Sequence, residues 1–456
     1  MSLPGRRPAP PITIRIGIMQ TTKFNLLDEL YLHLDKPDDP FSMHQELRVE
    51  GRLDAARLLT AIQYAAGMHP MARAFMLPWK PTDREYRWAI ADALAVSVLI
   101  EVDCADEIEV AEHRAALLAE SVPLIASPPF RCLLAHHPLG DYLIMNISHT
   151  VSDGTGQARL MRSIVRAYAG QPDPVPHFHA LQHRDLAELF GATSLSEQLR
   201  RYTPLAQYLV QSLLPPGRIA VEGGLEDEGF GLHFIKFRKA DIERLCARRE
   251  DDASVNDVLL AALHLAIQDW NTQHGQKTER LTAMMPVNMR PAEWNQDVVG
   301  NYSVFVAIGS QSTDRQNFSR TLRAITRWTR WYKETKGTAQ LIDLLRGAQW
   351  LPLWLKRASR DLIPLTGNRV VDSTALSNLG RLADLGSFGG KAGKVTEFWF
   401  SPPARMPLGV SLGVATHRDE MFLSFRYRKA QFSPDAAARF AEVFRRIVLN
   451  EPKQVV

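Results

Sequence analysis

One local pattern occurs twice in this chain and constrains its fold more than any other feature. Two β-type runs, 131–135 and 142–148, flank a turn containing Pro, Gly and Asp, and a helical pattern follows that ends at Gly170. The hairpin pattern of 409–427 is likewise followed by an amphipathic helical pattern over 434–449. The two copies share no residue-level repeat. The order of elements nevertheless predicts a mixed α/β (α+β) protein with two similar lobes.

Strand and helix patterns also alternate along the rest of the chain. Helical spacing is found over 22–33, from Asp54 onward, and over 110–119, 205–214, 241–248 and 254–270. Strand patterns are found over 45–49, 99–102, 230–237, 281–286 and 302–308.

The length of 456 residues exceeds what one hydrophobic core usually organises, so the sequence predicts more than one structural unit. We expect a flexible Pro-rich tail over 1–12, because this segment lacks the apolar stretch of a signal peptide. An N-terminal lobe is expected over 13–180 and a C-terminal lobe over 230–456. The segment 181–229, richer in Pro, His and polar residues, is predicted to connect them, partly as helix.

Composition excludes several functional classes. The net charge is only +4, from 54 basic and 50 acidic residues that are mixed along the chain, and so small an excess is weak evidence for a nucleic-acid partner. Three scattered cysteines, Cys104, Cys132 and Cys246, suit neither a disulfide framework nor a zinc or other metal site. No apolar stretch is long enough to span a bilayer. We therefore expect a cytoplasmic protein that binds no metal and no nucleic acid.

The run His149-Thr-Val-Ser-Asp153-Gly154 carries the strongest chemical signal, because it lies where an apolar strand has ended and a helix has not yet begun. Histidine can accept and return a proton near neutral pH, and glycine permits close approach to the backbone. A polar turn in which Asp153 caps the helix explains the same residues without any catalysis.

Four short motifs, in this order, resemble the CoA-dependent acyltransferase superfamily. This superfamily includes chloramphenicol acetyltransferases, nonribosomal-peptide condensation domains, bacterial wax-ester synthase/diacylglycerol acyltransferases and polyketide-associated acyltransferases. The motifs are His149-Thr-Val-Ser-Asp153-Gly154, Ser254-Val-Asn-Asp257, Met285-Pro-Val-Asn-Met-Arg290 followed by Gly300-Asn301, and Leu376-Ser377-Asn378-Leu379-Gly380.

The resemblance implies a chloramphenicol-acetyltransferase-like fold, in which two lobes meet in a V and a tunnel crosses their interface. His149 would lie midway along this tunnel as the general base. The implied activity is transfer of an acyl group from acyl-CoA or a carrier-protein thioester to an alcohol or amine, without an acyl-enzyme. The thioester is a co-substrate, and no permanently bound cofactor is expected.

The resemblance also implies roles for further residues. Asp153 and Gly154 would support the site, and Arg290 is the positional match for an arginine that pairs with Asp153; a solvated Arg290 is the alternative. Ser377 and Asn378 are candidates for oxyanion or pantetheine contacts, although hydrogen bonds within a sheet or turn also account for them.

Ser148 and Asn301 are candidate tunnel residues. Many family members have histidine where this chain has Ser148, so the effect of this departure on the chemistry is open.

Ester formation is favoured over amide formation, because Ser254-Val-Asn-Asp257 and Pro286-Val-Asn resemble the alcohol-acylating branches. The expected partners are a small-molecule or lipid acceptor, acyl-CoA and an acyl carrier protein, with a role in lipid or secondary metabolism. Two alternatives remain at this point: a non-catalytic domain that binds an acyl ligand or a carrier protein, and a free-standing amide-forming condensation enzyme.

Other segments imitate functional motifs. His136-His137-Pro-Leu-Gly-Asp141 fits the histidine motif by letter but is interpreted as a solvated hairpin turn. The glycine-rich 385–394 lacks the residues of a phosphate loop and is predicted to be a flexible connection. Ser254 with Asp257 predicts a helix capping box.

A segment rich in Trp, Leu, Arg and Lys follows later in the chain. It is predicted to be a packed helix pair, with contact to a membrane surface as the alternative. Its tryptophans are Trp328, Trp331, Trp350 and Trp354.

Overall fold

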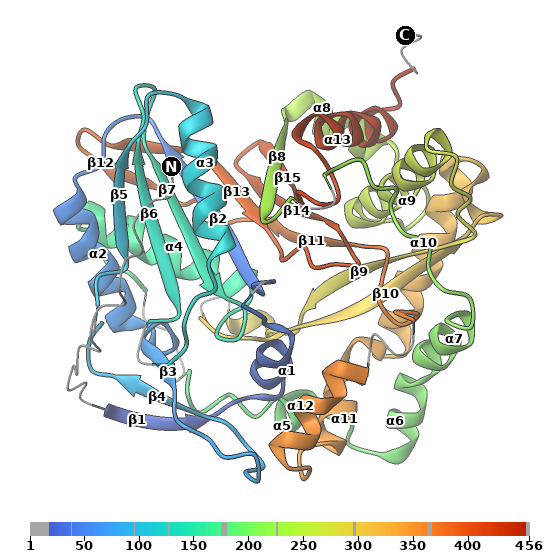
Figure 1. The fold of residues 1–456 in the computed structure, drawn as a ribbon, viewed down its shortest axis with the longest axis horizontal. Coiled ribbons are helices and arrows are strands. Elements are labelled where there is room, and N and C mark those ends of the chain that lie inside the picture. The colour runs from blue at the N-terminus through green and yellow to red at the C-terminus, as the bar shows by residue number, and fades with distance from the viewer. Residues whose placement is uncertain are drawn as a thin grey trace, which may run out of the picture.

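The structure is a computed structural model, and Figure 1 shows two lobes that lie side by side, each built on a β-sheet with helices packed against it. It describes residues 18–37, 39–94, 96–125, 128–174, 180–224, 227–294, 298–362 and 367–452. The predicted tail, 1–12, lies outside the described residues. Within the described residues the strands form three sheets. The expected mixed α/β class with two lobes is confirmed.

The sheet of the N-terminal lobe is antiparallel, except for the parallel pair β5–β6. Its strands follow the order β12 (Ser387–Gly389), β13 (Gly393–Ser401), β2 (Ser42–Val49), β7 (Tyr142–Ser148), β6 (Phe130–His136) and β5 (Leu99–Asp103). One face packs against α2 (Ala55–Met68) and α4 (Gly154–Ala169), and the other against α3 (Glu107–Ala119). The predicted hairpin of β6 and β7, followed by a helix that ends at Gly170, is present.

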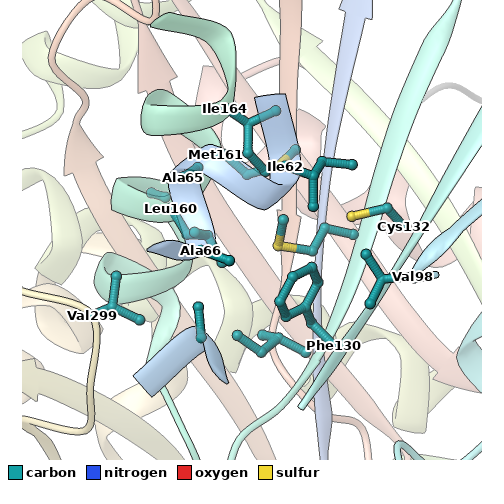
Figure 2. Packing of buried hydrophobic residues seen from close by; sticks show 14 of the residues in the cluster. Ile62, Ala65, Ala66, Val98, Phe130, Cys132, Leu160, Met161, Ile164 and Val299 are labelled. Carbon is teal, nitrogen blue, oxygen red and sulfur yellow. The ribbon is translucent and has the colours of Figure 1, made fainter. Parts of the chain in front are cut away.

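Helical spacing explains how α2 and α4 cover this sheet. Ile62, Ala65 and Ala66 lie on one face of α2 and meet Leu160, Met161 and Ile164 of α4 (Figure 2). Phe130 and Cys132 of β6 lie in the same buried cluster. This packing holds α4 against α2 and the sheet.

The sheet of the C-terminal lobe lies under a layer of long helices. Its strands follow the order β10 (Ser303–Gln311), β9 (Arg280–Asn288), β11 (Thr374–Arg381), β14 (Val410–His417), β15 (Glu420–Arg428) and β8 (Phe230–Phe237). The helices of this layer are α8 (Lys239–Ala247), α9 (Val255–Gln273), α10 (Phe318–Glu334) and α13 (Pro434–Leu449). The predicted capping box is confirmed, because Ser254 accepts from the Asp257 amide while the Asp257 carboxylate accepts from the Ser254 amide.

A strand exchange joins the two lobes. β13 follows β11 in the chain but pairs antiparallel with β2, with Phe398 opposite Leu47. The glycine-rich 385–394 forms the tight hairpin of β12 and β13 at the edge of the N-terminal sheet, rather than a flexible connection. Residues 230–456, expected to form the C-terminal lobe alone, therefore contribute the strands β12 and β13 to the N-terminal sheet. The division expected from the sequence does not include this exchange.

The remaining elements lie below the two main sheets in the view of Figure 1. A small sheet contains β1 (Ile18–Lys23), β4 (Arg87–Ala91) and β3 (Ala74–Met76). The helices are α1 (Leu26–Leu34), α5 (Leu186–Phe190), α6 (Leu195–Arg201), α7 (Thr203–Gln211), α11 (Gln340–Gly347) and α12 (Leu353–Leu362). Short 3₁₀ turns are formed by Pro70–Arg73, Ala292–Trp294, Asp314–Gln316 and Gly337–Ala339.

The helix predicted over 22–33 begins later, at Leu26. Residues up to Lys23 pair with β4, and the Asn25 side chain accepts from the amides of Leu27 and Asp28 as an N-cap. The helix predicted within 205–214 is confirmed as α7.

Candidate active site

The backbone around His149 is fixed by the elements on both sides. β7 ends at Ser148, and the His149 amide donates to the Phe41 carbonyl at 3.0 Å. Asp153 is the N-cap of α4 and accepts from the Gly156 amide at 2.9 Å. The loop between them is therefore held at a strand end and at a helix start.

The imidazole of His149 lies between two aromatic rings and faces a cavity. Its centroid is 3.9 Å from that of Tyr31 and 5.3 Å from that of Phe41, which is stacked at 14°. All three rings line the cavity. The Nδ1 atom of His149 is enclosed by protein, which leaves Nε2 as the ring nitrogen able to meet a substrate.

Burial controls the protonation of this ring. It lowers the pKa of His149 below its usual value, while hydrogen bonding at its own backbone and the Asp153 carboxylate partly oppose this effect. His149 is therefore a neutral imidazole at neutral pH, which is the form that can accept a proton.

Asp153 and Arg290 form a buried bidentate ion pair between the lobes. Nη1 of Arg290 lies 2.8 Å from Oδ2 of Asp153, and Nη2 lies 2.8 Å from Oδ1. The amide of Tyr302 and the hydroxyl of Ser303 also donate to Asp153, at 2.8 and 3.0 Å. Burial opposes ionisation of Asp153, but Arg290 and these donors outweigh it and hold its pKa below the usual range.

Arg290 has further partners and is not solvated. Its Nη2 donates to the carbonyls of Val298 and Gly300, at 3.0 and 2.9 Å, and its guanidinium lies over the Tyr302 ring. The pair consequently fastens the start of α4 to the loop before β10.

Two glycines allow close approach at this junction. A β-carbon on Gly154 would lie 2.9 Å from side-chain atoms of Leu379 and Phe400. A β-carbon on Gly156 would lie 2.9 Å from the backbone nitrogen of Gly300 in the other lobe. Gly154 and Thr155 line the cavity at the amino end of α4, which favours developing negative charge nearby.

The cavity has a volume of about 310 Å³ and follows a split in the C-terminal sheet. Within the described residues, β9 and β11 pair only at Thr374–Ala283 and Ala375–Met284. Beyond these pairs both strands continue along the cavity. Most of its lining is apolar: Leu34, Phe41, Met43, Met284, Pro286, Phe305, Val370, Val371, Ala375, Leu379, Phe400 and Leu408 are among the lining residues.

Of the other predicted site residues, two line the cavity and two do not. Ser377 and Asn378 line the cavity, and Oδ1 of Asn378 accepts from the Gly380 amide, as expected of a turn. Ser148 and Asn301 are buried and are not among the lining residues, so the expectation of tunnel contact is corrected for both.

Ser148 and Asn301 instead support the His149 loop. The Ser148 hydroxyl accepts from the Thr150 amide at 3.3 Å. The amide nitrogen of Asn301 donates to the carbonyls of His149 and Thr150, both at 2.9 Å, because it lies directly beneath this loop.

Sequence reasoning missed several residues of the site. Tyr31 falls within the helical pattern over 22–33, which carries no chemical signal for it; in the structure its hydroxyl donates to the Ser303 carbonyl at 2.8 Å. Phe41, Ser303 and Phe400 also line the cavity. Local patterns contain no signal for these positions, since the lobes bring them together across the chain.

Two other interpretations are corrected. His136 and His137 are buried rather than solvated, and the two ring nitrogens of His136 lie 2.7 Å from Asp141 and 2.9 Å from Glu101. In the tryptophan-rich segment, Trp328 is buried in α10, whereas Trp350 and Trp354 are exposed. The packed helix pair is therefore confirmed only for its first half.

No helix in the described ranges combines the length and apolar character needed to cross a bilayer.

Comparison with known proteins identifies relatives at the level of sequence. The sequence model of the condensation domain matches residues 32–339. An uncharacterized protein of Mycobacterium tuberculosis is 34% identical over 439 residues, which cover 94% of this chain and 100% of that protein. Malformin synthetase mlfA of Aspergillus homomorphus is 30% identical over 138 residues, which are 29% of this chain and 2% of that protein.

Solved structures show the same fold. The first condensation domain of the CDA synthetase matches with a TM-score of 0.70 and 14% identity, over 94% of this chain and 96% of that chain. A mutant starter condensation domain of rhizomide synthetase, in complex with C8-CoA, matches with a TM-score of 0.65 and 13% identity over 94% of both chains. The two-lobed chloramphenicol-acetyltransferase-like fold is confirmed.

Proposed function

The chain belongs to the condensation-domain family, and we propose that it transfers an acyl group from a thioester to a hydroxyl or amine, with His149 as the general base. The observation that carries this proposal is the neutral His149 ring, whose one available nitrogen faces a largely apolar cavity.

The reaction needs few groups. The oxygen or nitrogen of the acceptor attacks the thioester carbonyl carbon, and its proton passes to Nε2 of His149. The tetrahedral oxyanion is stabilised by donors at the amino end of α4 and by Ser377. The C–S bond then breaks, and the thiolate takes the proton from the imidazolium. This sequence requires no acyl-enzyme, so it involves no nucleophilic Ser or Cys.

The supporting residues act through the loop geometry. Asp153 and Arg290 hold the start of α4, and Asn301 holds the His149 carbonyl, so that the imidazole is positioned before substrate arrives. Tyr31 and Phe41 restrict the ring to one orientation.

The apolar lining supports an acyl chain as one substrate. A solved relative of the same fold is bound to C8-CoA, which supports a CoA thioester as donor; a carrier-protein thioester has the same reacting group. We propose an alcohol acceptor, in keeping with the two motifs that resemble alcohol-acylating branches.

Release of free thiol tests this function. The full chain is mixed with acetyl-, octanoyl- or palmitoyl-CoA and a panel of alcohols and amines, and His149→Ala is compared with the exposed control His113→Ala. We expect His149→Ala to keep its fold and lose about 10²–10⁴-fold in turnover, while the control retains wild-type turnover. Equal turnover in His149→Ala and wild type would remove His149 from the mechanism. Binding of an acyl ligand without turnover of any thioester would favour a non-catalytic domain.

A further inference from the structure

Helix α7 and the turn that follows it expose an apolar surface, called here the α7 face. The side chains of Leu209, Val210, Leu213 and Leu214 are exposed by 51%, 68%, 71% and 59%. Leu209 and Val210 lie in the last turn of α7, and Leu213 and Leu214 lie in the turn that directly follows it. Single exposed apolar residues are common on soluble proteins, but a contiguous group of this kind marks an interaction surface.

The exposed charges that flank the α7 face in the sequence are basic. Residues 198–221 contain no Asp or Glu; within them Arg200 is exposed and Arg218 is half-buried. Arg201 is buried and paired with Glu197 and Asp343, so it adds no charge to this surface. From another part of the chain, the exposed Arg369 donates from Nη1 to the Leu213 carbonyl at 3.0 Å. Apolar side chains flanked by arginine are the combination that binds anionic lipid bilayers.

The α7 face adjoins the cavity. The Tyr208 hydroxyl of α7 donates to the Val370 carbonyl at 3.2 Å, and Arg218 donates to the carbonyls of Asn368 and Asp372 at 2.8 and 2.7 Å. Asn368, Val370 and Asp372 line the cavity. Val370 is also 41% exposed, so the cavity lining reaches the surface next to α7.

We propose that the α7 face docks on an anionic lipid bilayer and that the cavity takes an acyl chain or a lipid-like acceptor directly from that bilayer. An apolar substrate then passes from the membrane along Val370 into an apolar cavity without crossing water. Docking is independent of catalysis, and the delivery of substrate rests on the proposed function.

Vesicle binding tests the docking. The full chain is sedimented with vesicles of phosphatidylcholine containing 30% phosphatidylglycerol, or of phosphatidylcholine alone. We compare wild type with Leu213→Glu/Leu214→Glu and with Leu139→Glu, a control at a hairpin turn where the side chain is 75% exposed. Circular dichroism and thermal unfolding establish that all three are folded. We expect binding to the anionic vesicles that falls at 0.5 M NaCl, at least a tenfold loss in the double variant, and no loss in the control.

Several results would overturn the proposal. These are no binding of wild type to anionic vesicles, equal binding by the double variant, or an equal loss in Leu139→Glu. A wild-type dimer that the double variant abolishes, without vesicle binding, would assign the α7 face to self-association. His149→Ala separates the two proposals, since this variant should bind vesicles as wild type does. Vesicle binding by wild type without turnover of any thioester would contradict the proposed function and still support docking.

Discussion

Asp153 and Arg290, 137 residues apart in the sequence, meet through two parallel 2.8 Å hydrogen bonds and join the helix start of one lobe to the other lobe. The two side chains are almost completely buried. A buried pair of this kind does not guarantee net stability, but removal of one partner leaves an uncompensated charge.

Replacing Asp153 by Asn should therefore lower the free energy of unfolding by about 3–5 kcal/mol, because Arg290 then keeps a buried charge without its carboxylate. Urea unfolding measures this change. The control is Asp103→Asn, which breaks an exposed pair with Arg52 and should change stability by less than about 1 kcal/mol. Similar losses in the two variants would mean that the buried pair does not fasten the lobes.

The pH dependence of turnover should follow the His149 ring. Because burial lowers the pKa of His149, the acidic limb of kcat/KM should lie below pH 6.5, and activity should be maximal at neutral pH. Rates measured from pH 4.5 to 8.5 under conditions where the fold is intact test this. An acidic limb centred above pH 7 would contradict a neutral, buried base.

Gly156 and Gly67 differ in the space available for an added β-carbon. Gly156→Ala places a β-carbon 2.3 Å from the Ser152 hydroxyl and 2.9 Å from the Gly300 nitrogen, and should destabilise the fold by about 1–3 kcal/mol. Gly67→Ala meets no atom within 4 Å in α2 and should stabilise it by about 0.5–1 kcal/mol. Thermal unfolding compares them, and a stabilising Gly156→Ala would show that the lobes do not press together there.

Asp372 should make the protein less stable as the pH rises. Burial raises its pKa from 3.8 to about 6, despite hydrogen bonds from Thr282 and Tyr208 and the charge of Arg280. The folded state therefore binds the carboxyl proton of Asp372 more tightly than the unfolded state does. As the pH rises from about 4 to about 6, the free energy of unfolding consequently falls.

Asp372→Asn removes this proton linkage. At pH 8 it should raise the free energy of unfolding by up to about 3 kcal/mol, and flatten its slope between pH 4 and 6. The control is the exposed Asp419→Asn. A wild-type slope in Asp372→Asn would assign the pH dependence to other groups.

The sequence predicted most elements whose hydrophobic pattern is local. The hairpin of β6 and β7, the helix up to Gly170 and the capping box at Ser254 all depend on neighbours in the chain. The small sheet was missed, since β3 covers only Ala74–Met76 and has no room for a pattern. The pairing of β13 with β2 was missed for another reason: local periodicity does not identify a partner strand 350 residues away.

The residues of the candidate site also fall into those that the sequence predicted and those that it did not. His149 and Asp153 were found because motif residues stand close together, and Arg290 was found through the resemblance. Tyr31 and Ser303 were not, because their place in the cavity results from the meeting of α1, β7 and β10. The placement of Asn301 beneath the loop, rather than in the tunnel, likewise depends on backbone positions in both lobes.

The pairing of β13 with β2 also has a consequence for biosynthesis. A ribosome makes β2 early, but the backbone groups on one of its edges find their partners only after residue 401 has been made. Until then the nascent N-terminal sheet has an open edge, to which another unfinished chain could add a strand. Native assembly of that sheet is therefore completed late in translation.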